Sequence, residues 1–198
     1  KIGDIVVDGT VPGHVQYHLL KEDDLMAKLP PSIDLLSAAL LGVTSVAVHD
    51  VQRACVTPDD RVLVLGAGVI GQMLAQAATA FGASVTVADL IQSRLDIAKE
   101  LGADDTYNLS KKEEKEALLG KEENFNVFFE TTGSDAVLKE LTGTGFDNRS
   151  VFARNCRLVI VAGRDDITYN SNAVQIKECT IVHVHHYDQR ALNTALRL

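Results

Sequence analysis

The chain has 198 residues, of which 46% are hydrophobic and 23% charged, and its formal net charge is −8 at pH 7. This length can bury one substantial core, and the composition is ordinary for a globular protein. The acidity argues against a nucleic-acid partner, no basic block favours an anionic membrane surface, and no apolar stretch approaches the ~20 residues of a membrane span.

The first thirty residues are predicted to form a small β structure. Residues 4–8 and 15–20 resemble short strands, and glycines and a proline separate them. Two consecutive prolines then break the chain, and Ser32 is predicted to be the N-cap of a helix that runs towards Val51. The β piece is too small to bury much by itself, so we expect it to be the edge of another domain.

From residue 61 onward, strands and helices are predicted to alternate. Apolar runs place strands at 61–65, 84–88, 126–130, 157–162 and 180–184, and a short strand near 106–109 is expected as the third in the alternation. Helices are expected over 69–81, 91–101 and 134–142, and the charged stretch 111–116 is interpreted as a solvated surface helix. The glycine-rich segment 142–149 precedes the wrong element for a phosphate cradle and is interpreted as a surface insertion. Six strands joined by right-handed crossovers predict an α/β fold with a doubly wound, parallel, Rossmann sheet.

Three glycines and one acid carry the chemistry. Gly66, Gly68 and Gly71 follow the first of these strands at G-x-G-x-x-G spacing, and Asp89 ends the second strand. The first glycine allows a tight turn, the second lets backbone approach phosphates, and the third lets the helix pack close to its strand. Strand, glycines, helix, strand and acid together predict a dinucleotide site, with the carboxylate on the adenosine ribose.

A methyltransferase is the main competing interpretation, because it also combines a glycine-rich turn with an acid after the second strand. Such enzymes usually carry an acid just before the glycines, where this chain has Leu65. After the fourth strand they tend to use an Asp- or Asn-Pro motif, and this chain has Thr131-Thr132-Gly133. Both positions favour the dinucleotide interpretation.

The cysteines and histidines give little support to a metal site. Cys55, Cys156 and Cys179 are far apart and form no C-x-x-C pair, so we expect neither a disulfide framework nor a zinc knuckle, and a reducing, cytoplasmic location is the simpler inference. Three histidines gather at the end of the sixth strand, namely His183, His185 and His186. Sites built from one strand's histidines are uncommon, so a strand end near the nicotinamide pocket or at a subunit edge is favoured.

Several segments, taken in order, resemble the medium-chain dehydrogenase/reductase superfamily, and within it the zinc-type alcohol, polyol and threonine dehydrogenases. Besides the glycine fingerprint, they are Gly13-His-Val-Gln-Tyr17, Leu25-Met-Ala-Lys-Leu-Pro30, Val46-Ala-Val-His49, Leu101-Gly-Ala-Asp104, Phe129-Glu-Thr-Thr-Gly133 and Val161-Ala-Gly163. The resemblance covers essentially the whole chain. It implies a piece of a longer enzyme, with residues 1–31 a remnant of the GroES-like catalytic domain, 32–54 the linking helix and 55–198 the NAD-binding Rossmann domain.

The resemblance also implies which residues hold the cofactor. The phosphate turn and the start of its helix correspond to Gly66, Gly68, Val69, Ile70 and Gly71, with Ile70 behind the nicotinamide ring. Asp89, Leu90 and Arg94 correspond to the adenosine end, and Thr131 and Thr132 to residues that contact the riboses. Ala162, Gly163 and Arg164 correspond to the turn whose backbone holds the carboxamide, and the Arg164 side chain is expected to be solvated.

The identity of the cofactor follows from the acid. A 2′-phosphate beside Asp89 would meet a like charge, and Leu90 offers no compensating donor, so NAD is expected in preference to NADP. Arg94 could soften this preference.

Zinc is possible in the intact protein, but no ligand is expected in this chain. The family's one ligand in this stretch would fall near positions 41 and 42, where Leu41 and Gly42 cannot bind a metal. The catalytic residues therefore stay unknown from this sequence, and so does the identity of the substrate.

We therefore expect the cofactor-binding part of an NAD-dependent oxidoreductase that moves a hydride between a secondary alcohol or polyol and nicotinamide. The partner would be a small alcohol or carbonyl substrate, and a homodimer or homotetramer would form through the sixth strand. The segment alone is expected to bind NAD and to be inactive. Two alternatives stay open: a zinc-independent quinone or enone reductase of the same superfamily, and a non-catalytic dinucleotide-binding module.

Overall fold

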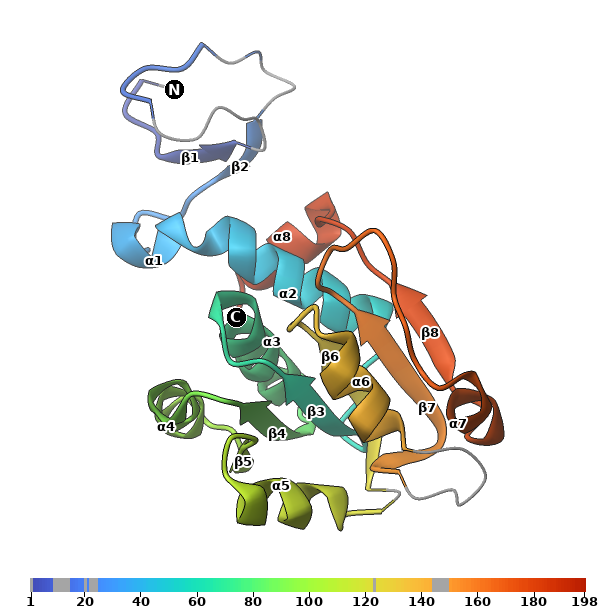
Figure 1. Cartoon of the computed structure of the whole chain (residues 1–198). Helices are drawn as coiled ribbons and strands as arrows, with labels where there is room; N and C mark the ends of the chain where they lie inside the picture. The colour runs from blue at the N-terminus through green and yellow to red at the C-terminus, as the bar shows by residue number, and fades with distance from the viewer. Residues whose placement is uncertain (1, 9–14, 20, 22–24, 123, 144–149) are drawn as a thin grey trace.

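A six-stranded parallel sheet forms the centre of the computed structural model, which describes residues 2–8, 15–19, 21, 25–122, 124–143 and 150–198 (Figure 1). Its strands are β3 (Arg61–Leu65), β4 (Ser84–Asp89), β5 (Asp105–Asn108), β6 (Phe125–Glu130), β7 (Phe152–Ile160) and β8 (Thr180–His183). The spatial order is β5-β4-β3-β6-β7-β8, and all neighbours are parallel. The order reverses between β3 and β6, which confirms the doubly wound α/β fold.

Helices cover both faces of this sheet. They are α1 (Leu35–Ala39), α2 (Leu41–Arg53), α3 (Val69–Ala80), α4 (Gln92–Glu100), α5 (Lys112–Leu119), α6 (Asp135–Thr142), α7 (Ser171–Ile176) and α8 (Gln189–Ala195). In β3, Val62 and Val64 join the core that packs against α2, α3 and α8, whereas Leu63 and Leu65 join the core beneath α5 and α6. The strand alternates between two buried faces, which is why its sequence is apolar throughout.

No helix in the described part of the chain is both long and apolar enough to cross a membrane.

The helix after the glycines begins and ends nearly where the sequence predicts. Its buried face carries Gly71, Leu74 and three alanines, which allows close packing on the sheet. Gly82 follows the end of α3 with φ of +91°, a left-handed conformation that suits glycine and stops the helix. The chain then enters β4 directly, so Asp89 arrives at the same edge of the sheet as the glycines.

The N-terminal predictions are only partly correct. A two-stranded antiparallel sheet does form, but from β1 (Val6–Asp8) and β2 (Leu25–Lys28), and residues 15–19 form no strand. The N-cap is Asp34 and not Ser32, because the amide of Ile33 donates to the Pro30 carbonyl in a turn and delays the helix. The helix also breaks at Leu40, between α1 and α2.

The fifth strand of the main sheet differs from its prediction at both ends. This strand, β7, begins at Phe152, five residues earlier than predicted, and ends at Ile160, two residues earlier. It ends there because the amides of Val161 and Ala162 both donate to the carbonyl of Glu130, at 3.0 and 3.1 Å.

Two predicted segments lie outside the described residues. They are the turn after β1, predicted from its glycines and proline, and most of the glycine-rich segment 142–149.

Candidate functional site

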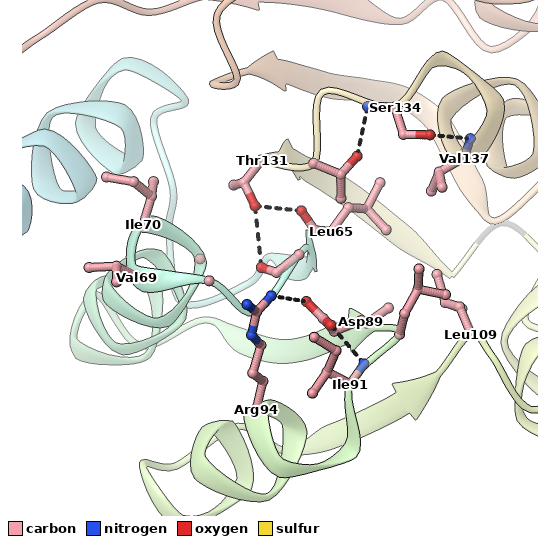
Figure 2. Close-up of a pocket in the computed structure, with 16 residues that line it drawn as sticks. Leu65, Val69, Ile70, Asp89, Ile91, Arg94, Leu109, Thr131, Ser134 and Val137 are labelled. Atoms are coloured by element: carbon pink, nitrogen blue, oxygen red, sulfur yellow. Dashed lines mark hydrogen bonds and ion pairs between the residues drawn. The ribbon is translucent and has the colours of Figure 1, made fainter.

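A cavity of about 560 Å³ opens at the switch point of the sheet, between the carboxyl ends of β3, β4 and β6 and the start of α3 (Figure 2). Ten of the thirteen residues predicted to hold a cofactor line it: Gly66, Gly68, Val69, Ile70, Gly71, Asp89, Leu90, Arg94, Thr131 and Thr132. Apolar side chains that the sequence did not single out complete the wall, namely Ile91, Leu109 and Val137. Ligands of open α/β sheets bind at this position.

Glycine is present at each of the three fingerprint positions for a different physical reason. A Cβ at Gly71 would lie 1.8 Å from the carbonyl oxygen of Gly66, so the helix could not approach the strand. Gly66 has a φ of +98°, and its Cβ would lie 2.5 Å from Oγ1 of Thr131. A Cβ at Gly68, by contrast, would meet nothing within 4 Å. The fold requires glycine at the first and third positions, and at the second position glycine only leaves space open.

That open space lies at the N-terminus of α3. Gly68 is the N-cap, so no side chain caps the helix, and no acidic residue stands in the first turn. The first-turn amides of any helix lack intrahelical acceptors, and the helix dipole adds partial positive charge at this end. The arrangement is therefore suited to a negatively charged group such as a phosphate.

Asp89 is held firmly beside this turn. One of its carboxylate oxygens accepts the amide of Ala67 at 2.6 Å, and the other accepts the amide of Ile91 at 2.8 Å. Nη1 of Arg94 lies 3.9 Å away, and the Arg94 side chain is half exposed (Figure 2). Leu90 is exposed and offers no donor. The acid thus forms part of the cavity wall, as the sequence predicts, and the turn itself fixes its position.

Thr131 joins the two halves of the sheet at the switch point. Its amide and its hydroxyl both donate to the carbonyl of Leu65, at 3.0 and 2.6 Å, so the end of β6 is tied to the end of β3. Ser134, which the sequence did not single out, also lines the cavity and caps α6 by accepting the amide of Val137. Both anchors shape the side of the cavity opposite Asp89 (Figure 2).

A buried ion pair between Glu130 and Arg164 is a feature that the sequence analysis missed. Glu130 is fully buried, and one carboxylate oxygen accepts the amides of Thr132 and Gly133 at 2.8 and 2.9 Å. The other accepts Nη2 of Arg164 at 2.6 Å. The expectation that Arg164 is solvated is wrong: its side chain is only 13% exposed. The sequence did contain a signal for this pair, because Glu130 ends an apolar strand in the same way as Asp89 does.

The remaining predicted residues lie apart from the main cavity. Ala162, Gly163 and Arg164 line a second cavity of about 150 Å³, together with His183 and Val184 at the end of β8. Gly163 resembles Gly68, because a Cβ there would meet nothing within 4 Å. Its neighbour Ala162 already uses its amide on the carbonyl of Glu130, so a ligand at this turn must use other backbone groups.

The histidines and cysteines form no metal cluster within the described ranges, where no group of three or more suitable side chains comes together. The rings of His185 and His186 contact each other with centroids 4.1 Å apart, and Nδ1 of His49 lies 4.0 Å from a carboxylate oxygen of Asp188. The three cysteines are free thiols.

Asp50 on α2 is another residue that the sequence analysis missed. Its side chain is fully buried, and neither carboxylate oxygen has a hydrogen-bond partner within the part of the chain that the structure describes. Burial raises the pKa of this carboxyl to about 7. An acid whose helix neighbours Ala47, Val48 and Val51 are apolar was the signal in the sequence.

Comparisons with known proteins agree with this geometry. The family model for zinc-binding dehydrogenases matches residues 69–198. A probable D-xylulose reductase A from Aspergillus fumigatus is 38% identical over 134 residues, which are 66% of this chain and 35% of that protein. An uncharacterised zinc-type alcohol dehydrogenase-like protein from Escherichia coli is 31% identical over 135 residues, 65% of this chain and 38% of that protein.

Solved structures show the same fold over most of the chain. An Escherichia coli oxidoreductase/dehydrogenase of unknown specificity superposes with a TM-score of 0.77 at 26% identity, covering 89% of this chain and 49% of that one. The 2R,3R-butanediol dehydrogenase of Bacillus subtilis gives a TM-score of 0.76 at 27% identity, covering 90% and 50%. The chain thus spans about a third of the length of these curated relatives and about half of these solved structures.

The glycines provide a matched pair of variants. Gly71→Ala should lower the free energy of unfolding by about 3 kcal/mol, because its Cβ overlaps the Gly66 carbonyl. Gly68→Ala should lower it by less than about 1 kcal/mol, because its Cβ enters open space. Urea unfolding followed by circular dichroism measures both, and equal losses would contradict these separate roles.

The buried ion pair can be tested in the same way. Glu130→Gln removes the buried counter-charge of the Arg164 guanidinium and leaves it only Asp135, 3.9 Å from Nε, so the free energy of unfolding should fall by about 3–5 kcal/mol. Glu116→Gln is the control, because it removes an exposed pair with Lys112 on α5 and should change stability by less than about 1 kcal/mol. The role of the pair would be refuted by similar urea midpoints for the two variants.

Proposed function

The chain belongs to the zinc-binding dehydrogenase family, and on that premise we propose that it is the cofactor-binding part of an NAD-dependent oxidoreductase. The intact protein would transfer a hydride between a secondary alcohol or polyol and the nicotinamide. The single observation that carries the proposal is the open backbone at Gly68, in front of the uncapped N-terminus of α3 and beside the anchored carboxylate of Asp89.

The residues of the main cavity fit the adenosine diphosphate half of the cofactor. The pyrophosphate would take the amides at the start of α3, where a Cβ at Gly68 would stand in its way. Asp89 would accept a hydroxyl of the adenosine ribose, and Arg94 would lie beside the adenosine. The apolar wall of Ile91 and Leu109 would cover the adenine.

The nicotinamide half would lie across the switch point, over the carboxyl ends of β6, β7 and β8. We assign Ile70 to the back of the ring, Thr131 and Thr132 to the riboses, and the turn at Gly163 to the carboxamide. The Glu130–Arg164 pair would act on this half by holding the ends of β6 and β7 in place. Arg164 would thus be a positioning residue.

When bound, the cofactor would supply the hydride acceptor or donor. This chain's residues would bind it, orient it and keep water from its apolar side. The group that polarises the substrate oxygen is assigned to other parts of the intact protein, because Leu41 and Gly42 carry no metal ligand. The D-xylulose reductase likeness supports a polyol as the substrate class.

Two parts of the proposal concern assembly. The β1–β2 sheet would be the edge of a catalytic domain, with α1 and α2 as the link to the cofactor domain. Strand β8 lies at the edge of the main sheet, and we propose that it pairs with a second copy of the chain to form a dimer or tetramer.

Calorimetric titration tests the cofactor assignment. NAD should bind, and NADP should bind at least about tenfold more weakly, because its 2′-phosphate would meet the like charge of Asp89. Asp89→Asn should reduce the difference in affinity between NAD and NADP, because it removes this negative charge. Asp96→Asn is the matched control, since it removes an exposed carboxylate of α4 outside the cavity and should leave both affinities unchanged. Absence of NAD binding, or tighter binding of NADP, would refute the proposal.

A further inference from the structure

The buried carboxyl of Asp50 lowers the stability of the fold, and no interaction among the described residues compensates for its burial. It lies on α2 between the buried residues Val48 and Val51, and the described chain offers no hydrogen bond to either of its oxygens. An unpaired carboxylate in such surroundings opposes folding, and the raised pKa expresses this cost. An apolar side chain would suit this position in the core better. An acid at this position therefore suggests an interaction with a bound ligand.

The position of Asp50 indicates where such a ligand would bind. It lines a cavity of about 250 Å³ together with Val46 of α2, Val161 and Gly163 after β7, and residues 184–186 after β8. This cavity lies between α2 and the residues that follow β7 and β8. Those two strands lie on the opposite side of the sheet from β4, which ends at Asp89 (Figure 1). It shares the open turn at Gly163 with the neighbouring cavity of about 150 Å³.

The two redox forms of a nicotinamide differ in charge. The oxidised ring is a cation and the reduced ring is neutral, so a nearby buried carboxylate attracts only the oxidised ring. Resting on the function proposed above, we propose that Asp50 is a specificity-determining residue that makes this site favour the oxidised over the reduced cofactor. Asp50 is one of the residues that line the half-site proposed to receive the ring, and neither of its oxygens has a hydrogen-bond partner within the described part of the chain.

The negative charge of Asp50 also couples binding of the oxidised cofactor to release of a proton. Below about pH 7 the Asp50 carboxyl is largely protonated, so the oxidised cofactor must displace that proton to gain the attraction. Each binding event then releases up to one proton from Asp50 to solvent. As the pH rises through 7 the carboxylate is already ionised, so affinity for the oxidised form should rise. Affinity for the reduced form should not rise.

Other charged groups near α2 are arranged differently from Asp50. Those that face the cavity or adjoin it from α2, α8 and the ends of β7 and β8 are His49, Asp188, Arg164, Asp165, Asp166, His183, His185 and His186. The first two lie near each other, Arg164 is bound to Glu130, and α3 carries no charged side chain. His185 and His186 line the same cavity as Asp50, so a variant that lacks both imidazoles is the control.

The experiment compares three ligands by calorimetry at pH 6, 7 and 8: NAD+, NADH and ADP-ribose, which lacks the nicotinamide. At pH 8, Asp50→Asn should reduce the preference for NAD+ over NADH about tenfold or more, and should leave the affinity for ADP-ribose unchanged. The double variant His185→Asn, His186→Asn should keep the pH dependence of the wild-type preference. Asparagine suits the φ of +53° at position 186.

The outcomes separate this inference from the proposed function. If ADP-ribose fails to bind the wild-type chain, the dinucleotide site itself is refuted. If ADP-ribose binds and Asp50→Asn leaves the NAD+/NADH preference unchanged, the role of Asp50 is overturned. A wild-type measurement covers the case in which the variant does not fold. In two buffers of different ionisation enthalpy, NAD+ should release a proton at pH 6.5 and NADH should not, and equal proton release would overturn the role.

Discussion

The contact between Gly71 and the carbonyl of Gly66 constrains everything else at the switch point. Because no side chain separates them, α3 begins directly above the end of β3 and directs its free amides into the crevice. Asp89 ties β4 to the same turn through the amide of Ala67, and Thr131 ties β6 to it through the carbonyl of Leu65. Contacts from β3, β4 and β6 thus define the conformation of this one turn.

Two buried carboxylates in this molecule illustrate opposite solutions to the same problem. Glu130 accepts two backbone amides and an arginine, so its burial stabilises the ends of two strands. Asp50 is equally buried and has no such partners within the described structure. The first acid is explained by the fold. The second has no such explanation within the described residues, and the oxidised nicotinamide proposed to bind near it carries the opposite charge.

The sequence predicted the parts of the fold that depend on local pattern. Apolar runs located five of the six strands of the main sheet, the alternation of strands and helices located the polar β5, and the glycine spacing located the start of α3. The failures were local ambiguities: residues 15–19 have strand-like composition but form no strand, and Ser32 lost the N-cap to Asp34 because a proline turn intervenes. Arg164 was misjudged because its partner, Glu130, lies 34 positions earlier in the chain.

The sequence by itself determined the order of strands and helices and the residues of the phosphate turn, because spacing and hydrophobic period act over short stretches of chain. Only the tertiary structure decided which groups are buried and what they face. It separated the structural glycines from the open Gly68, paired Glu130 with Arg164, and placed Asp50 beside the ends of β7 and β8. Burial and partnership depend on contacts between distant segments, and no local pattern records those contacts.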